Sequence, residues 1–136
     1  MTINYWGIPA AAVAAWVFGA AYYGALGGKW MAALGRSEKE IEARRAQKAV
    51  PVVPMIVSFV AELVMAFILA GLMAHLGGFS VRTGLLTGAI CWFGFVLTTT
   101  ATNHGYQQAK PSLTLIDSAH WLGVMLIQGA VLGALG

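Results

Sequence analysis

Long apolar segments fill most of this chain, and its charges are gathered in one stretch between two of them. Residues 29–48 hold six of the eight basic residues and three of the five acidic ones. Charged residues make up 10% of the chain, whereas a soluble domain has about 25%. Because so few charges cannot build a water-facing surface, the sequence predicts an integral membrane protein.

The apolar segments are separated by short polar connections, and each is long enough to cross a bilayer. About 20 apolar residues span the hydrocarbon core, so the 136 residues have room for four such segments in a single transmembrane domain. The predicted fold is an all-α bundle of four transmembrane helices. Their predicted ranges are 5–28, 52–76, 81–101 and 113–135.

The charged stretch contains the signal for a helix of its own. Ser37 is followed three residues later by Glu40, which is the spacing of a capping box at a helix N-terminus. We therefore expect a short amphipathic helix from about Glu38 to Lys48, lying along the lipid headgroups. The alternative is a solvated connector whose basic residues only set the orientation of the protein.

The distribution of basic residues predicts that orientation. Loops rich in lysine and arginine stay on the cytoplasmic side. The stretch 29–48 and Lys110 lie on one side of the predicted bundle, and the other side has Arg82. Both chain termini are therefore predicted to lie on the non-cytoplasmic side of the cytoplasmic membrane.

Small residues recur at every fourth position in three of the predicted helices. This spacing lets two helix backbones approach closely. We expect the same faces to support self-association, so the predicted partners are membrane lipid and either a homo-oligomer or a larger membrane complex. Nucleic acid is not expected, because the basic residues lie in a juxtamembrane loop. The small residues are Ala20, Gly24, Gly28, Gly84, Gly88, Gly129 and Gly133.

Three short motifs resemble a known family. They are AAYYGALGGKWM at residues 20–31, CWFGF at 91–95 and LIDSAHWL at 115–122. Together they resemble the small four-span bacterial membrane proteins grouped as domain of unknown function number seventeen sixty-one. The resemblance implies a four-helix fold in the bacterial inner (cytoplasmic) membrane. It implies no activity, because none is assigned to that family.

Ionisable side chains within the predicted helices are the candidate functional residues, because a charge inside the bilayer is costly. Glu62 lies about 15 Å into the second helix at 1.5 Å per residue, near the bilayer midplane. Asp117 and His120 form an i, i+3 pair in the fourth helix, with His120 about one turn from the level of Glu62. Gln128 returns to nearly the same face of the fourth helix as Asp117. Five further polar candidates are expected in the same cytoplasmic half: Tyr22, Tyr23, Ser58, Thr98 and Asn103.

A structural interpretation is open for each of these residues. Glu62 could join two helices by hydrogen bonds, and Asp117 could form a capping box with Thr114. His104 is predicted to lie in a solvated loop. The scattered histidines and the single Cys91 do not form a metal site, so neither a metal nor a cofactor is predicted.

Three functions fit this pattern. The first is the binding or transport of a small solute, ion or proton through a polar cavity that faces the cytoplasm and includes Glu62. The second is a structural role, as an accessory subunit or a homo-oligomeric scaffold. The third is an enzyme that uses Asp117 and His120 as an acid–base pair, which is the weakest of the three because it depends on their spacing alone.

Overall fold

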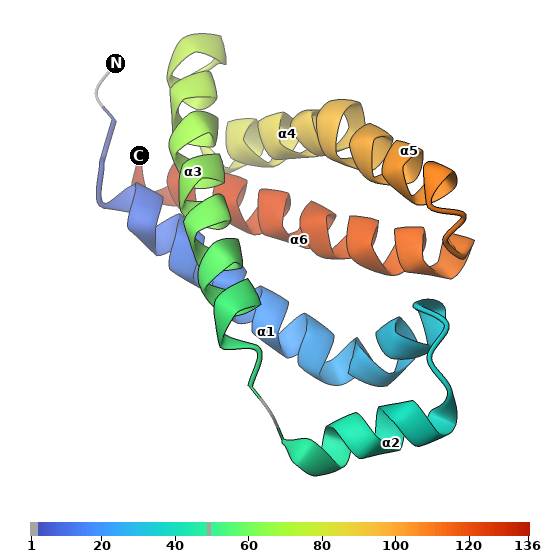
Figure 1. The fold of residues 1–136 in the computed structure, drawn as a ribbon. Helices are drawn as coiled ribbons and strands as arrows, with labels where there is room; N and C mark the ends of the chain where they lie inside the picture. The colour runs from blue at the N-terminus through green and yellow to red at the C-terminus, as the bar shows by residue number, and fades with distance from the viewer. Residues whose placement is uncertain (1–2, 49) are drawn as a thin grey trace.

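The computed structural model of the protein describes residues 3–48 and 50–136, and these residues fold into helices without any β-strand (Figure 1). The predicted all-α fold is therefore confirmed for the described part of the chain. The elements are α1 (Gly7–Ala33), α2 (Glu38–Gln47), α3 (Val52–Leu76), α4 (Val81–Cys91), the π-helical segment η1 (Trp92–Leu97), α5 (Thr98–Tyr106) and α6 (Pro111–Leu135).

Four helical stretches in the described residues are long and apolar enough to cross a membrane. They are α1, α3, the continuous run from α4 through η1 to α5, and α6, and each has 25 to 27 residues. At about 1.5 Å per residue each exceeds the hydrocarbon core, which is about 30 Å thick. The predicted bundle of four spans with a short helix after the first one is confirmed.

Helix α6 lies at the centre of the bundle, with α1 on one side and α4 on the other (Figure 1). Helices α1 and α6 run antiparallel: Asn4, just before α1, donates a side-chain hydrogen bond to the Leu135 carbonyl at the end of α6, at 2.8 Å. Helix α3 crosses α1 and also touches α6 and α4. The end of the bundle that carries α2, Tyr106 and Pro111 is called the α2 end below.

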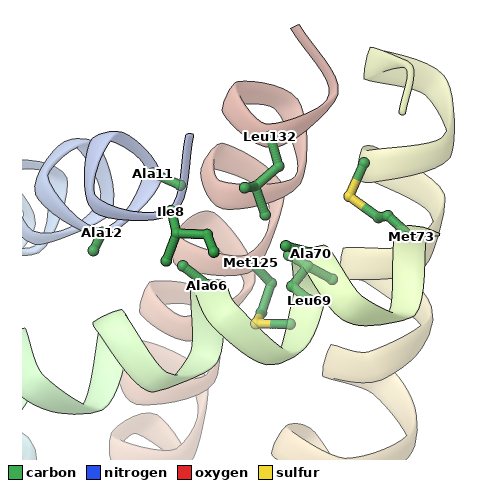
Figure 2. Packing of buried hydrophobic residues seen from close by; sticks show 9 residues of the cluster. All are labelled: Ile8, Ala11, Ala12, Ala66, Leu69, Ala70, Met73, Met125 and Leu132. Carbon is green, nitrogen blue, oxygen red and sulfur yellow. The ribbon is translucent and has the colours of Figure 1, made fainter. Parts of the chain in front are cut away.

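The apolar core lies where α1, α3 and α6 meet (Figure 2). Alanines at Ala11 and Ala66 are fully buried and let the backbones of α1 and α3 approach each other. Larger side chains fill the remaining space between the three helices. The other members of this cluster are Ile8, Ala12, Leu69, Ala70, Met73, Met125 and Leu132.

Glycines form the contact between α4 and α6. A Cβ atom on Gly84 would overlap the carbonyl oxygen of Gly129, and one on Gly88 would lie 2.5 Å from the carbonyl oxygen of Met125. A side chain at these positions would force the two backbones apart, because a carbonyl of a helix cannot rotate away. The close approach expected of these small residues is thus found, and the structure shows that α4 and α6 are the helices that pair through them.

The corresponding prediction for α1 is wrong within this chain. Ala20 and Gly24 are exposed, and a Cβ on Gly24 would meet no atom within 4 Å. Instead, α1 packs through Ala11, Ala12 and Ala15, which are fully buried. Because α1 is apolar on all sides, the sequence pattern could not distinguish its packed face from its exposed one.

Two helices extend beyond their predicted ends. Helix α1 continues to Ala33 rather than stopping at residue 28, and α5 continues to Tyr106 rather than stopping at residue 101. Lys110 lies between α5 and α6 and donates to the Ala32 carbonyl at 3.3 Å, so it satisfies a carbonyl at the end of α1. Because α5 reaches Tyr106, the segment around His104, which was predicted to be a loop, is helical.

Helix α2 begins as its sequence predicted. The Glu40 amide donates to the Ser37 hydroxyl oxygen at 3.3 Å, which makes Ser37 the N-cap. None of the α2 side chains in the described residues is buried. Arg45 nonetheless reaches back against the Gly28 backbone, where its guanidinium fills the space that a Cβ would take. The helix is a surface connector held beside the end of α1.

Candidate functional site

The carboxylate of Asp117 is the centre of a polar cluster at the α2 end, between α1, α5 and α6. The Tyr23 hydroxyl donates to Asp117 Oδ1 at 2.7 Å. On the other side, His104 Nε2 lies 3.8 Å from Asp117 Oδ2, which is ion-pair distance when the imidazole is protonated. His104 Nδ1 and the Thr114 hydroxyl are hydrogen-bonded at 2.8 Å. Three helices thus meet around one carboxylate, and His104 is part-buried rather than solvated.

His120 lies beside this carboxylate in a shell of aromatic rings. Its side chain is nearly buried, at 5% exposed. The Tyr23 ring centroid is 4.8 Å from that of the imidazole, and the Phe18 ring is stacked on it at 6.1 Å. A Cβ on Gly19 would lie 2.9 Å from His120 Nε2, so the ring is seated against the backbone of α1. Within the described residues, His120 Nδ1 has no hydrogen-bond partner.

Tyr22 completes this region but faces a backbone group. Its hydroxyl donates to the Ile116 carbonyl at 2.6 Å, and its ring lies 5.6 Å from the His120 ring. We call Tyr22, Tyr23, His104, Asp117 and His120 the Asp117 cluster. It contains four predicted candidates and one residue, His104, that the sequence interpretation placed elsewhere.

Glu62 and Gln128 form a second polar group, which we call the Glu62–Gln128 pair. Both are buried, at 2% and 0% exposed. The Gln128 amide nitrogen donates to the backbone carbonyl of Glu62 at 2.8 Å. Among residues 3–48 and 50–136, no hydrogen-bond partner reaches Glu62 Oε1 or Gln128 Oε1.

The two groups lie at different levels of the bundle. Gln128 is eight residues beyond His120 on α6, or about 12 Å along the helix axis. The predicted separation of about one turn between Glu62 and His120 is therefore wrong, and about two turns separate the groups. The error arises because counting depth along each helix ignores the oblique path of α3 across its neighbours (Figure 1).

Three predicted candidates lie outside both groups. The Ser58 hydroxyl donates to the Met55 carbonyl of its own helix at 2.9 Å. The Thr98 hydroxyl likewise donates to the Gly94 carbonyl at 2.9 Å. Asn103 is exposed and lines a shallow surface groove with Thr98 and its neighbours. The hydroxyls of Ser58 and Thr98 are therefore satisfied within their own helices and belong to neither polar group.

Sequence reasoning missed two residues of this region. His104 was assigned to a loop because the segment before Pro111 is polar, although α5 continues through His104 to Tyr106. Ser118 was overlooked beside Asp117. It is 4% exposed, and its carbonyl accepts a hydrogen bond from Trp92 Nε1 at 2.8 Å. A small polar residue one position from a predicted site residue was the available signal.

The chemistry available here is that of protons and small cations. The described residues contain no group of three or more histidine, cysteine, aspartate or glutamate side chains that could hold a metal ion. The Asp117 cluster offers one carboxylate, two phenols and two imidazoles, which are groups that exchange protons or attract a cation. Across the described chain, no hydrogen bond joins Asp117 to His120 directly, which weakens the acid–base pair proposed from their spacing.

Four apolar spans, a core held by small residues and isolated polar groups between the helices define a small helical integral membrane protein. A sequence comparison identifies the family of this protein. The chain belongs to the family described as "Protein of unknown function (DUF1761)", which it matches over residues 6–133. No curated protein and no solved structure matches the chain.

Proposed function

We propose that this protein binds or transports a small solute, ion or proton that enters from the cytoplasmic side. The observation that carries the proposal is the Asp117 carboxylate, which Tyr23 and His104 approach from two other helices. Ionisable groups inside a membrane bundle are costly and commonly mark ion or substrate paths. A purely structural contact would be met by uncharged side chains at lower cost.

The proposed direction depends on the orientation of the protein in a bacterial inner membrane. The α2 end carries the basic residues of 29–48 together with Lys110. Positive charges favour the cytoplasmic side, so the Asp117 cluster would face the cytoplasm and both termini the opposite side. Single cysteines at Asn4 and Gln107, introduced after Cys91→Ser, test this orientation. A membrane-impermeant maleimide applied to intact spheroplasts should label Asn4→Cys and spare Gln107→Cys; the reverse pattern would refute it.

Flux measurements in proteoliposomes test the proposed function. Purified protein is reconstituted with a pH-sensitive dye inside the vesicles, and a potassium diffusion potential drives cation movement. Parallel assays add Na⁺ or K⁺ gradients. The test variant is Asp117→Asn, which keeps the shape of the side chain and removes its charge. Glu42→Gln, an exposed position on α2, is the matched control for loss of one negative charge.

The wild-type protein should accelerate the flux of at least one ion over protein-free vesicles. Asp117→Asn should lower that rate by about tenfold or more, which corresponds to about 1.4 kcal/mol, while Glu42→Gln should leave it unchanged. Thermal unfolding of the wild-type and variant proteins in one detergent, before reconstitution, checks that the variant is folded. Wild-type flux equal to that of empty vesicles, or an unaffected Asp117→Asn variant, would refute transport through this cluster.

A second function is favoured by the exposed face of α1. Ala20 and Gly24 offer a surface of small residues that no other described helix of this chain covers. Such a face suits close packing against another membrane helix, as in an accessory subunit or a homo-oligomer. Gentle extraction from native membranes tests this role. A partner or a second copy recovered in fixed ratio from wild type, and lost from Gly24→Leu, would support it, whereas a monodisperse single chain would contradict it.

A further inference from the structure

The Glu62–Gln128 pair contains two of the four buried side-chain polar atoms that have no hydrogen-bond partner in the described residues. The Gln128 side chain of α6 reaches the backbone of Glu62 on α3, and both side chains are almost completely buried. The amide nitrogen is used by the Glu62 backbone, which leaves the two side-chain oxygens Glu62 Oε1 and Gln128 Oε1 unpaired within the described chain. Both of these atoms are hydrogen-bond acceptors when the carboxyl group is ionised.

Neighbouring side chains supply nothing that would satisfy these oxygens. The buried residues next to the pair on α3 and α6 are Ala66, Val124 and Met125. Ala66 and Met125 belong to the apolar core, to which α1 contributes Ile8, Ala11 and Ala12 and against which Cys91 of α4 packs. The other ionisable groups on α6, His120 and Asp117, lie about two or more turns away. Among residues 3–48 and 50–136, no lysine, arginine or histidine forms a hydrogen bond or an ion pair with the side-chain oxygens of this pair.

Two buried acceptors without a donor need a hydrogen-bond donor or a cation as a partner. Each unsatisfied buried group costs about 1–3 kcal/mol, and more when it is charged. Such groups in a native protein commonly indicate an ion, a water molecule or a functional role. One monovalent cation between the two oxygens would satisfy both, whereas a divalent ion would ask for more carboxylate and oxygen ligands.

We propose that Glu62 and Gln128 form an intramembrane site for one monovalent cation, either a proton or an alkali-metal ion. This inference rests on the proposed function for the entry of the cation from the cytoplasmic side, and it names the ligand class at a second, inner position. Glu62 supplies the negative charge, and the Gln128 amide oxygen supplies the second contact. The hydrogen bond from the Gln128 nitrogen to α3 orients that oxygen.

Labelling with dicyclohexylcarbodiimide tests the site, because this apolar reagent modifies carboxyl groups inside membrane proteins in their protonated form. The protein in lipid nanodiscs is treated between about pH 5 and about pH 9 at constant ionic strength, in NaCl, LiCl or choline chloride. Mass spectrometry of peptides measures the adduct on Glu62, and Glu62→Gln identifies the site. Gln128→Met removes the amide at similar volume, and Gln107→Met makes the same change at an exposed position.

Either of two results supports the proposal and identifies the cation. Labelling that falls with rising pH and ignores the salt indicates a proton site. Labelling that Na⁺ or Li⁺ suppresses by about tenfold, at about ten times the dissociation constant, indicates an alkali-metal site. Gln128→Met should abolish the salt effect or move the half-point by about one pH unit or more, and Gln107→Met should change neither.

Three results overturn the proposal: no adduct on Glu62 at any pH, an adduct rate that is independent of both pH and salt, or a folded Gln128→Met protein that behaves like wild type. The wild-type titration alone is decisive if Gln128→Met fails to fold. The outcome is separable from the proposed function, since labelling is measured without an ion gradient and requires no transport. A responsive Glu62 without any ion flux would leave a cation site in a protein that does not transport.

Discussion

The glycine contact between α4 and α6 allows a quantitative prediction. Gly84→Ala would place a methyl group where the Gly129 carbonyl oxygen lies, and the two helix backbones would have to separate. Overpacking of this kind costs about 1–3 kcal/mol. Alanine is favoured over glycine in a helix by up to about 1 kcal/mol, which offsets part of this cost. We expect a net loss of about 1–2 kcal/mol in the free energy of unfolding.

Gly71→Ala is the matched control for this substitution. Gly71 lies within α3, and a Cβ there would meet no atom within 4 Å. The control therefore gains the helix preference of alanine, up to about 1 kcal/mol, without any overlap. The two variants should differ by about 2–3 kcal/mol, which is a factor of about 30 to 150 in the unfolding equilibrium constant.

Unfolding in mixed micelles with increasing sodium dodecyl sulfate provides the assay, with the loss of helicity followed by circular dichroism. Both variants and the wild type are measured in one lipid–detergent mixture. A Gly84→Ala protein that is as stable as Gly71→Ala would show that α4 and α6 are not in backbone contact.

Two further substitutions test single hydrogen bonds. Trp92→Phe removes the bond from the indole to the Ser118 carbonyl and should cost about 0.6–1.5 kcal/mol in the same micelle assay; unchanged stability would show that the bond contributes nothing. Ser37→Ala removes the N-cap of α2 and should cost that helix about 1 kcal/mol. Hydrogen exchange at the Glu40 amide should then quicken about fivefold, and an unchanged rate would contradict the capping role.

The sequence was sufficient to predict the number and type of the helices. Long apolar segments leave few alternatives in a membrane, because every backbone group must be bonded within its own helix. Local signals also sufficed where one residue decides the outcome, as Ser37 does at the start of α2. The end of α5 was predicted wrongly because no single residue decides it. The polar residues near Tyr106 continue a helix as readily as they form a loop.

The arrangement of the candidate residues was only partly predictable. Tyr23 and Asp117 were expected at a similar depth, and the structure joins them by a hydrogen bond. Glu62 was expected in the same group but lies with Gln128 instead. Depth along each helix can be counted from the sequence, but the crossing of α3 over α1 and α6 follows from side-chain packing that no single helix encodes. The exposed face of α1 escaped prediction for the same reason.

The π-helical segment η1 (Trp92–Leu97) changes which residues of the third span can face α6. Gly84 and His104 are twenty residues apart, and at about 100° per residue an unbroken α-helix would put them on nearly opposite sides. Each π-turn accommodates an extra residue, which turns the following helix back by about 100°. Both residues can then approach α6: Gly84 through backbone contact and His104 through Thr114 and Asp117. The segment therefore rotates the second half of this span relative to the first half. It joins α4, which packs closely on α6, to α5, which supplies the His104 imidazole. The loss of a single residue from η1 would turn His104 away from the Asp117 carboxylate.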